Sequence, residues 1–489
     1  MKQNASRRPS RLHLLARLSW TCARLAISKQ KDLIPQTIYT SFRELGGVYV
    51  KFLQMLVLRS ESFQSLRDYN IYDVYDQVNT EPIDIRALLA AELGDSASSL
   101  VLEGDAPFAA GSFGQVYLAR HRDKWVILKV LRPSIVSDLK FDLRILGVLS
   151  RFIDLFSFGS AFNMRRVHKE FARSALLETN YLLEADYAST LYERYRHHPN
   201  LVIPYTYREL STARLICQDY VAGIAATDLI KAAEGGLDIQ KYVAETLGSD
   251  LTRQLVALGS EVLSSVFLYG TAYGDPHPGN IKFLPGNKVG LIDYGVQAPA
   301  PKDTLNFHRL IQEYYKIYSG QPDLRGYSRV LLDLYGGDII QAAYSLDEYY
   351  ATGTHSLLDK LIDSAEQIMD SQRDLISGLV NNNKMMMIFN GVINKNNQFC
   401  LEYNLDGPEI MRAGVLFISL VSNLGVKNEV LRQTYADVLE RTKDVALNAG
   451  QPTIHPETAL EILASWFDQI SYKNPQLYRR IKRERPVYV

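Results

Sequence analysis

The sequence has few cysteines, no excess of charge of either sign and no long apolar run, and each lack excludes a class of protein. Its three cysteines, Cys22, Cys217 and Cys400, are too far apart to indicate a zinc site or a disulfide framework. Its 54 Lys and Arg residues equal its 54 Asp and Glu residues, so net charge gives no sign of nucleic-acid binding. The longest apolar run, residues 413–421, is far shorter than the roughly eighteen residues of a membrane span. We therefore expect a globular chain of a reducing compartment that neither crosses a membrane nor binds nucleic acid.

Basic residues are nevertheless concentrated at both ends of the chain. Residues 1–31 contain eight Lys or Arg residues and no acidic residue, and residues 479–485 are basic too. Four apolar residues near the start share one face of a helical projection: Leu14, Leu18, Cys22 and Leu25. Three interpretations stay open, namely a helix packed on the protein core, peripheral contact with anionic lipid, and a mitochondrial transit peptide. The expected location is cytoplasmic, with peripheral contact at the inner membrane face, or alternatively the mitochondrial matrix.

The local pattern divides the chain into a helical start, a strand-rich middle and a long helical second half. Residues 35–93 have helical spacing, and residues 101–132 form short β-type runs separated by turn residues. Residues 141–195 have helical spacing again. Beyond Gly223 helical spacing dominates, apart from one predicted hairpin that turns at Pro285-Gly286-Asn287.

A loop of small residues lies between two of the β-type runs: Ala109-Ala110-Gly111-Ser112-Phe113-Gly114-Gln115-Val116. Because small side chains do not block the backbone, N–H groups in such a loop can approach phosphates. A small-residue β-turn explains the pattern equally well. A dinucleotide-binding loop fits less well, because a helix would have to follow it, whereas the next residues have strand character.

Further residues occur in the order and spacing of a kinase active site. Lys129 interrupts an apolar run, so it either points to solvent or meets a partner in a buried site. Asp275 precedes Asn280 by five positions, as in the kinase catalytic loop, and Asp293-Tyr294-Gly295 stands in the place of the kinase Asp-Phe-Gly. Phosphoryl transfer requires oxygen ligands for Mg²⁺, a cation for the phosphates and an oriented acceptor. We therefore predict that Asn280 and Asp293 bind Mg²⁺ and that Lys129 contacts ATP phosphates. Asp275 would orient the acceptor or act as a base.

Four motifs together resemble one family: Lys51-Phe52-Leu53-Gln54, Ala109-Ala110-Gly111-Ser112, Glu178-Thr179-Asn180 and Asp275-Pro276-His277-Pro278-Gly279-Asn280. Over roughly residues 40–300 the chain resembles the UbiB/AarF family of atypical kinases, which support ubiquinone biosynthesis in bacteria and mitochondria. The motifs correspond to the family's lysine-x-glycine-glutamine helix, alanine-rich loop, Glu-x-Asp motif and Asp-Pro-His-Pro-Gly-Asn signature, and the last is present in full. Three residues depart from the family pattern: Leu53 for glycine, Asn180 for aspartate and Gly111 for alanine.

The resemblance implies an α+β, two-lobed protein-kinase-like fold with an N-terminal helical extension and additional C-terminal helices. Residues 1–100 would form the extension that carries the Lys51-Gln54 motif, and residues 101–223 the N-lobe. Residues 224–345 would form the core of the C-lobe, and residues 346–489 the C-terminal helical region.

The resemblance also implies roles for individual residues. Gln218 to Val221 would form the hinge beside adenine, so the expected ATP-binding residues are Ala109, Ala110, Gly111, Ser112, Phe113, Gly114, Val116, Lys129, Gln218 and Val221. Glu184 is the expected partner of Lys129, and Glu178 would face Lys51, while Gln54 lies on the same helix. The implied cofactors are ATP and Mg²⁺, and the implied ligand is an isoprenoid or phenolic small molecule.

Two classes of function remain open. The first is an atypical kinase or ATPase whose turnover is coupled to handling a lipid-like isoprenoid precursor. The second is a nucleotide-binding scaffold without physiological phosphotransfer. Asp275 favours the enzyme, because a site that only bound ATP would not need this carboxylate beside Asn280 and Asp293. A small-molecule kinase of the aminoglycoside or choline type is a third possibility, and the Lys51-Gln54 helix argues against it.

Overall fold

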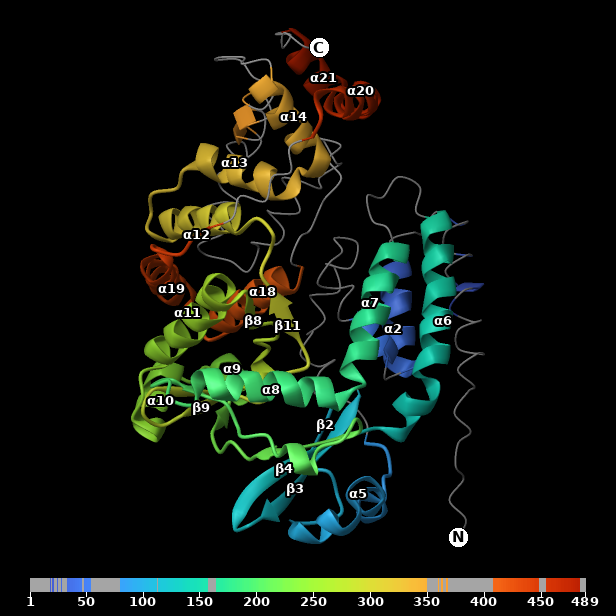
Figure 1. Cartoon of the computed structure of the whole chain (residues 1–489), viewed down its shortest axis with the longest axis vertical. Helices are drawn as coiled ribbons and strands as arrows, with labels where there is room; N and C mark the ends of the chain where they lie inside the picture. Colours follow the sequence, from blue (N-terminus) through green and yellow to red (C-terminus); the bar gives the residue numbers. More distant parts are fainter. Residues whose placement is uncertain are drawn as a thin grey trace. The chain divides into compact units, whose positions relative to one another are not determined.

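The computed structural model describes residues 18, 20–21, 24, 28, 33–45, 48–53, 80–111, 113–156, 164–349, 359, 362–363, 366–367, 408–447 and 454–483. The chain divides into two compact units. The first comprises residues 1–193 and 204–220, and the second comprises residues 194–203 and 221–489. Figure 1 shows the course of the chain and the labels of its elements. Each unit is described by itself below.

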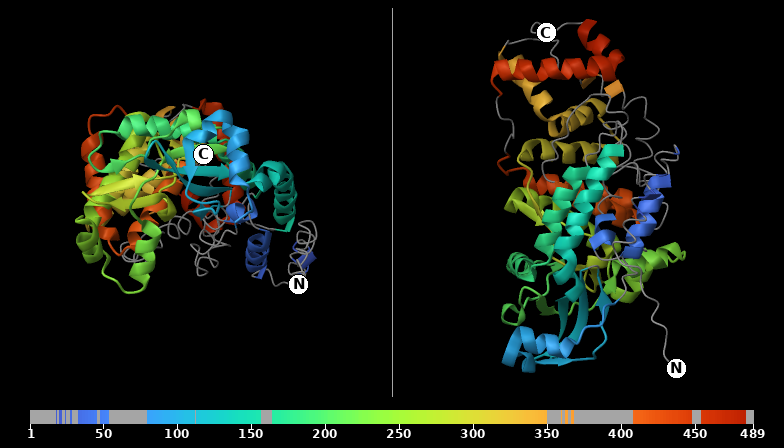
Figure 2. Two further views of the ribbon diagram at one scale, coloured as in Figure 1. Left: turned by 90° about the horizontal axis from the view of Figure 1, so that it is seen from below. Right: turned by 90° about the vertical axis from the view of Figure 1, so that its right-hand side faces the viewer.

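The first unit contains an antiparallel sheet in the strand order β1-β3-β4-β6, with β2 added to β3. The strands are β1 (Leu100–Leu102), β2 (Ala109–Ala110), β3 (Gly114–His121), β4 (Lys124–Leu131) and β6 (Leu215–Asp219). Alternation along β3 and β4 sends Tyr117, Leu128 and Val130 into a core that includes Ile85 and Leu89 of helix α5 (Ile85–Leu93). Figure 2 shows α5 beside this sheet. Val116 and Lys129 are cross-strand partners and therefore share the opposite face.

A second core in the first unit lies among helices. Its helices are α2 (Ile34–Leu45), α6 (Pro133–Phe156), α7 (Met164–Glu178) and α8 (Tyr181–Tyr195), together with the helical residues 48–53. Buried aromatic residues of this core include Phe42, Tyr49, Phe52 and Phe171. Helix α6 begins at Pro133 rather than near residue 141 as expected, because proline is favoured in a first helical turn, where its missing N–H costs no hydrogen bond.

Helices dominate the second unit. Ten have described bounds: α9 (Ala226–Glu234), α10 (Ile239–Leu247), α11 (Leu251–Tyr269), α12 (Thr304–Tyr318), α13 (Leu324–Tyr335), α14 (Gly337–Tyr349), α18 (Pro408–Asn423), α19 (Lys427–Thr442), α20 (Pro456–Lys473) and α21 (Pro475–Arg483). Helix α19 packs against both α11 and α12, while α20 packs against α14. Within the described residues, no helix is both long and apolar enough to cross a membrane.

Two small sheets complete the second unit. One has the order β5-β10-β9-β7, and the other pairs β8 with β11. Their strands are β5 (Leu201–Val202), β7 (Ile224–Ala225), β8 (Thr271–Tyr273), β9 (Ile281–Leu284), β10 (Lys288–Leu291) and β11 (Gln297–Pro299). The predicted β9–β10 hairpin is confirmed, and its turn residues Gly286 and Asn287 have φ values of 72° and 56°, which glycine and asparagine tolerate best.

Glu261 on α11 links that helix to α19 through a buried charge. Its carboxylate accepts hydrogen bonds from His198 Nε2 at 3.1 Å and from the Arg441 guanidinium of α19. Burial raises the pKa of Glu261, but the hydrogen bonds from His198 and Arg441 outweigh burial and hold this pKa below its ordinary 4.5. The charged form is therefore the one that stabilises the fold.

We expect Glu261→Gln to lower the free energy of unfolding by about 2 kcal/mol near neutral pH, because charged hydrogen bonds are replaced by weaker ones. A depressed pKa contributes stability above the unfolded value of 4.5 that is lost as pH falls through the folded value, so the difference should shrink in acid. Urea unfolding at several pH values measures it. Glu245→Gln, at an exposed residue of α10, is the matched control, and a pH-independent difference for Glu261→Gln would contradict this account.

Candidate functional site

Lys129 is held by a buried partner. It lies on β4 and shares a face with Val116 of β3, and its Nζ lies 2.7 and 2.9 Å from the two carboxylate oxygens of Glu184 on α8. The Glu184 side chain is 5% exposed and the Lys129 side chain 18%. Lys129 Nζ also lies 5.1 Å from the ring centroid of Tyr181. Of the two outcomes that the sequence left open for Lys129, the structure has the buried partner.

The small-residue loop is the tip of the β2–β3 hairpin. Ala109 pairs with Val116 and Ala110 with Gln115, and Gly111 N–H donates to Gly114 O at 2.9 Å. Gly114 has no room for a Cβ, because the Tyr181 hydroxyl and the backbone oxygen of Val130 occupy that space. Ser112 lies outside the described residues. The end of the hairpin therefore packs against Tyr181, whose ring centroid also lies 5.1 Å from Lys129 Nζ.

The helical residues 48–53 contact this loop. Lys51 forms an ion pair with Glu178, and its Nζ lies 4.7 Å from the ring centroid of Phe113. Leu53, where the family has glycine, is 1% exposed and packs in the helical core of the first unit. Gln54 lies outside the described residues. The structure thus brings Lys51, Glu178 and the loop together.

Asn180 keeps a backbone role at the position where the family has aspartate. It directly precedes α8, and its side-chain oxygen accepts the N–H of Leu182 at 3.2 Å. Aspartate and asparagine both cap helix N-termini in this way. The substitution therefore preserves a local hydrogen bond at the start of the helix that carries Glu184.

The expected hinge, Gln218 to Val221, comprises the last two residues of strand β6 and the two residues after it. Gln218 pairs with Ile127 of β4, so it shares the face of Lys129, and its Nε2 donates to Thr206 Oγ1 at 2.9 Å. Tyr220 N–H donates to Trp125 O at 2.9 Å. Val221 begins residues 221–489, the longer of the two segments that form the second unit, and its side chain is 8% exposed.

In the second unit, the β9–β10 register brings Asn280 and Asp293 to one end of the hairpin. Ile281 pairs with Leu291, and the next residue on each strand follows the same register, because Ile292 N–H donates to Asn280 O at 3.1 Å. Asp293 follows directly. Its Oδ1 accepts the N–H of Gly295 at 3.0 Å, which fixes the carboxylate in the Asp-Tyr-Gly turn.

Asp275 completes this arrangement. Asn280 Nδ2 donates to Asp275 O at 3.2 Å and to Asp275 Oδ2 at 3.3 Å. Because the Asn280 amide nitrogen faces Asp275, its carbonyl oxygen is turned the other way, as a Mg²⁺ ligand would require. His277, between the two, is 7% exposed, and its Nδ1 accepts Gly279 N–H at 3.1 Å, so it fixes the turn.

The donor chemistry of this set fits Mg²⁺. The described residues contain no group of three or more His, Cys, Asp or Glu side chains arranged to hold a metal ion. Asp293 and Asn280 instead offer a carboxylate and an amide oxygen, and Mg²⁺ is typically held by one or two protein oxygens together with substrate phosphates and water. A magnesium ion bound with nucleotide matches this pattern better than a resident metal would.

Arg412 is a site residue that the sequence did not reveal. It lies on α18, and its NH2 is 3.1 Å from Asp275 Oδ1. The two residues are 137 positions apart. No motif spans such a distance, and Arg412 simply precedes the apolar run 413–421, so only the fold brings it to Asp275.

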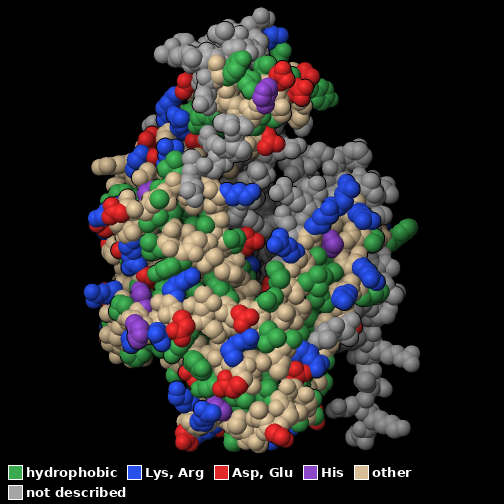
Figure 3. Space-filling view, viewed as in Figure 1, with side chains coloured by type: hydrophobic (Ala, Val, Ile, Leu, Met, Phe, Trp, Pro, Cys, Tyr) green, Lys and Arg blue, Asp and Glu red, His purple; other side chains and the backbone are tan. Residues whose placement is uncertain are grey.

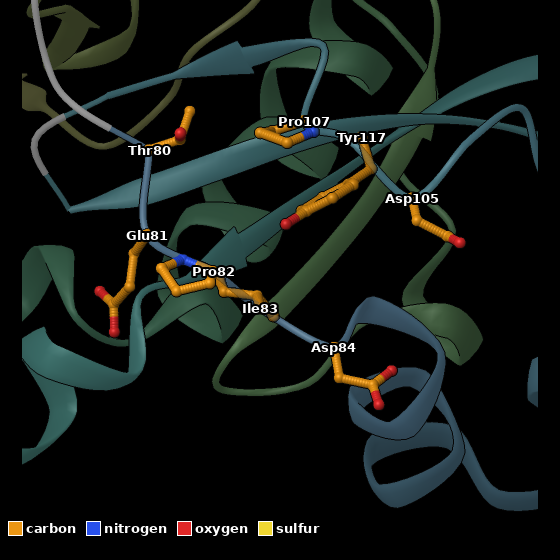
Figure 4. A pocket seen from close by; sticks show the side chains of 8 residues that line it. All are labelled: Thr80, Glu81, Pro82, Ile83, Asp84, Asp105, Pro107 and Tyr117. Carbon is orange, nitrogen blue, oxygen red and sulfur yellow. The ribbon is translucent and has the colours of Figure 1, made fainter. Parts of the chain in front are cut away.

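A pocket of ≈ 420 Å³ in the first unit is separate from these residues. Figure 4 shows its lining residues, which are Thr80, Glu81, Pro82, Ile83, Asp84, Asp105, Pro107 and Tyr117. Tyr117 lies on the face of β3 opposite Val116 and Lys129. The Glu81 carboxylate there accepts hydrogen bonds from the Ser134 hydroxyl and N–H, which anchors the start of α6. The pocket is therefore not the candidate nucleotide site.

Comparison with known proteins gives a consistent result. Protein ACTIVITY OF BC1 COMPLEX KINASE 1, chloroplastic, of Arabidopsis thaliana is 27% identical over 277 residues, which are 55% of this chain and 39% of that protein. Probable protein kinase UbiB of Shewanella denitrificans is 31% identical over 248 residues, which are 49% of this chain and 43% of that protein. A solved complex of Rv3197 with erythromycin from Mycobacterium tuberculosis has a TM-score of 0.43 and 16% identity over 87% of this chain and 99% of that chain, a similarity too low to bear on function.

The matched segment spans about two fifths of the length of these two curated relatives. Residues 73–318 match the family described as the ABC1 atypical kinase-like domain. This match covers half of the chain and confirms the predicted α+β, kinase-like fold class and the resemblance drawn from the four motifs. The chain belongs to the ABC1 atypical kinase-like family, which includes UbiB.

Proposed function

We propose that the chain is an ATP- and Mg²⁺-dependent atypical kinase or ATPase of the UbiB type. We further propose that it acts on an isoprenoid or phenolic small molecule in quinone biosynthesis or related lipid handling. The observation that carries the proposal is the β9–β10 register, which places Asn280 opposite Ile292, the residue before Asp293, while Asn280 donates to Asp275. An Asp, an Asn and a second Asp in this order are the oxygen set that phosphoryl transfer uses.

Each unit carries part of the proposed apparatus. In the first unit, the Glu184 carboxylate holds the ammonium of Lys129, which lies on the same face of the sheet as Val116. Bound Mg-ATP supplies the transferable phosphoryl group and a cation that offsets its charge. In the second unit, Asn280 and Asp293 offer oxygens to that cation, and Asp275 orients the acceptor or takes its proton.

Purified chain tests the proposal through ATP turnover, measured with and without anionic vesicles and phenolic quinone-precursor mimics. We expect Mg²⁺-dependent turnover that a phenolic mimic increases. If the phenolic mimic does not change the rate of ATP turnover, the chain would be an ATPase that acts with a different ligand. Absence of turnover under every condition would remove the enzyme proposal.

A nucleotide-binding scaffold remains the second candidate, because one observation favours it. Arg412 pairs with Asp275 Oδ1 and Asn280 Nδ2 donates to Asp275 Oδ2, so both carboxylate oxygens of Asp275 already have a partner within the protein. If this pair persists with nucleotide bound, Asp275 has no role in transfer. The Asp275 variant described in the Discussion separates the two candidates.

The contact of Lys51 with the loop supports exclusion of protein substrates. Lys51 forms an ion pair with Glu178 and also contacts the Phe113 ring, so the helical residues 48–53 lie against the small-residue loop of the β2–β3 hairpin. We propose that this helix blocks the groove that kinases use for peptides, while water or a small acceptor can enter.

We expect no appreciable phosphorylation of generic protein substrates by the intact chain. Lys51→Ala should permit autophosphorylation or shift ATP affinity by about fivefold, because it breaks a partly buried ion pair at the loop. Transfer of radiolabelled phosphate measures both effects, and Lys124→Ala, at an exposed residue of β4, is the matched control. Robust protein phosphorylation by intact chain, unchanged by Lys51→Ala, would show that this helix does not guard the site.

The proposed setting is cytoplasmic with peripheral membrane contact, and the mitochondrial matrix is the alternative. Most of residues 1–31 lie outside the described residues. Of the apolar face expected there, Leu18 is 3% exposed and belongs to the helical core of the first unit. This burial favours a packed helix at Leu18, and contact of the basic residues of the segment with anionic lipid stays a proposal.

A further inference from the structure

Helices α6 and α7 of the first unit form a tightly packed pair. His168 Nε2 on α7 donates to Leu143 O on α6 at 2.7 Å. A Cβ at Gly147 of α6 would meet the His168 ring at 2.9 Å, so the two helices approach closely because position 147 has no side chain. Leu143, Leu146 and Phe171 point to the core on one side. The opposite sides of both helices therefore form one continuous outer face.

On α6 this outer face mixes cations with apolar side chains. Lys140, Arg144 and Arg151 are exposed. Between them Phe141 is 47% exposed and Val148 is 63% exposed. The spacing of three or four residues places all five on one stripe of the helix. Large apolar side chains at this exposure are not explained by packing within the unit.

Helix α7 continues the pattern. Arg165, Lys169 and Arg173 are exposed at intervals of four residues. Leu176 and Leu177, at the end of the same helix, are 46% and 51% exposed. Figure 3 shows Lys and Arg side chains gathered over this part of the molecule with hydrophobic side chains between them.

No described carboxylate side chain of the two helices is exposed. Asp142 is buried and accepts a hydrogen bond from the Tyr49 hydroxyl at 3.0 Å. Glu178 is 10% exposed and pairs with Lys51. Asp138 is half-buried. On the outer face of α6 and α7, called the basic face below, the exposed charged side chains that the structure describes are therefore all cationic, although the whole chain is neutral.

We propose that the basic face binds an anionic lipid surface. Phosphate and carboxylate headgroups would meet the Lys and Arg side chains, while Phe141, Val148 and the leucines enter the boundary between headgroups and acyl chains. Two helices lying flat offer these groups to a plane. Nucleic acid would match the charge but not the aliphatic side chains. An acidic protein would match both, and the test below distinguishes it.

The proposal does not depend on nucleotide chemistry. The residues of the basic face are not among those assigned to ATP, Mg²⁺ or the acceptor, so failure of lipid binding and failure of ATP turnover are separate results. It also differs from contact through the chain ends, since the basic face lies within residues 140–177.

The experiment is co-sedimentation of the full chain with phosphatidylcholine vesicles, with and without phosphatidylserine. We expect binding only to the anionic vesicles, weakened by salt. Lys169→Glu/Arg173→Glu should lower vesicle affinity by at least about tenfold, since each cation near an anionic surface contributes a several-fold factor. Arg122→Glu/Lys124→Glu, at exposed residues in the β3–β4 turn and at the start of β4, makes the same charge change and should lower affinity much less.

A second variant tests the apolar part. Phe141→Ser/Val148→Ser keeps the charge and should lower affinity several-fold, with the remaining binding more sensitive to salt. Unchanged melting temperatures show that each variant is folded. Three results would overturn the proposal: no preference for anionic vesicles, equal losses for the basic-face and control variants, or loss only on deletion of residues 1–31. Absence of vesicle binding together with capture of an acidic protein by the basic face would replace lipid with a protein partner.

Discussion

Asp293→Asn is expected to reduce Mg²⁺-dependent ATP binding and turnover by at least about a hundredfold, since a neutral amide cannot replace a carboxylate charge at a divalent cation. The structure indicates that this substitution can leave the hydrogen bonding of the turn unchanged. Asp293 Oδ1 accepts Gly295 N–H, and an asparagine side-chain oxygen can accept the same bond. The turn should therefore fold, and the loss should fall on the metal.

Titration of ATP binding against Mg²⁺, with turnover measured in parallel, gives the result. Asp250→Asn is the matched control, because Asp250 caps α11 in the same unit by accepting Arg253 N–H, and asparagine caps a helix equally well. The control should keep the Mg²⁺ dependence of the unsubstituted chain. Equal Mg-ATP affinity and turnover in Asp293→Asn would remove Asp293 from the metal site.

Asp275→Asn is expected to lower turnover by at least about a hundredfold while ATP affinity changes by less than about threefold, because Asp275 acts toward the acceptor rather than toward the nucleotide. Asparagine keeps an oxygen for Asn280 Nδ2, so the local hydrogen bond can persist. What it loses is the ability to accept a proton and the charge that faces Arg412.

Single-turnover kinetics beside equilibrium ATP binding separates the two effects. A full ATPase rate in Asp275→Asn would support the scaffold, in which Arg412 holds Asp275 away from chemistry. Loss of binding and turnover together would instead indicate that the Asp275 loop has a structural role. Arg412→Lys is the companion variant, since a lysine keeps the charge but not the planar geometry of the guanidinium.

The parts of the fold that were predictable are those with strong local signals. The β9–β10 hairpin was predicted because Pro285-Gly286-Asn287 interrupts two β-type runs, and positive φ at Gly286 and Asn287 is the physical cause. Lys129 and Glu184 were expected as partners through the family resemblance, and Lys129 Nζ lies 2.7 Å from Glu184 Oε1. Strands β8 and β11 were missed, because three-residue strands are too short for an alternating pattern to appear.

The parts that were not predictable depend on contacts distant in sequence. Arg412 reaches Asp275 only because α18 packs in the second unit, and nothing near position 412 indicates this. The start of α6 at Pro133 was missed because the residues that follow it, Ser-Ile-Val-Ser-Asp, are weaker helix formers than those after residue 140. Leu53 departs from the family glycine and is buried in a core that includes residues of α2, α6, α7 and α8. Gln54 and Ser112 lie outside the described residues, and their roles remain predictions.

The central claim is that this chain binds ATP through Mg²⁺ and that Lys129 meets the phosphates. Equilibrium binding of ATP to the purified intact chain and to Lys129→Arg, each with Mg²⁺ and with chelator, tests it most directly. The prediction is saturable binding that requires Mg²⁺ in the intact chain and weakens by about tenfold or more in Lys129→Arg, because a guanidinium cannot keep the geometry of the ammonium on Glu184. Absence of ATP binding by the intact chain, or equal binding with Mg²⁺ and with chelator in both proteins, would contradict the account.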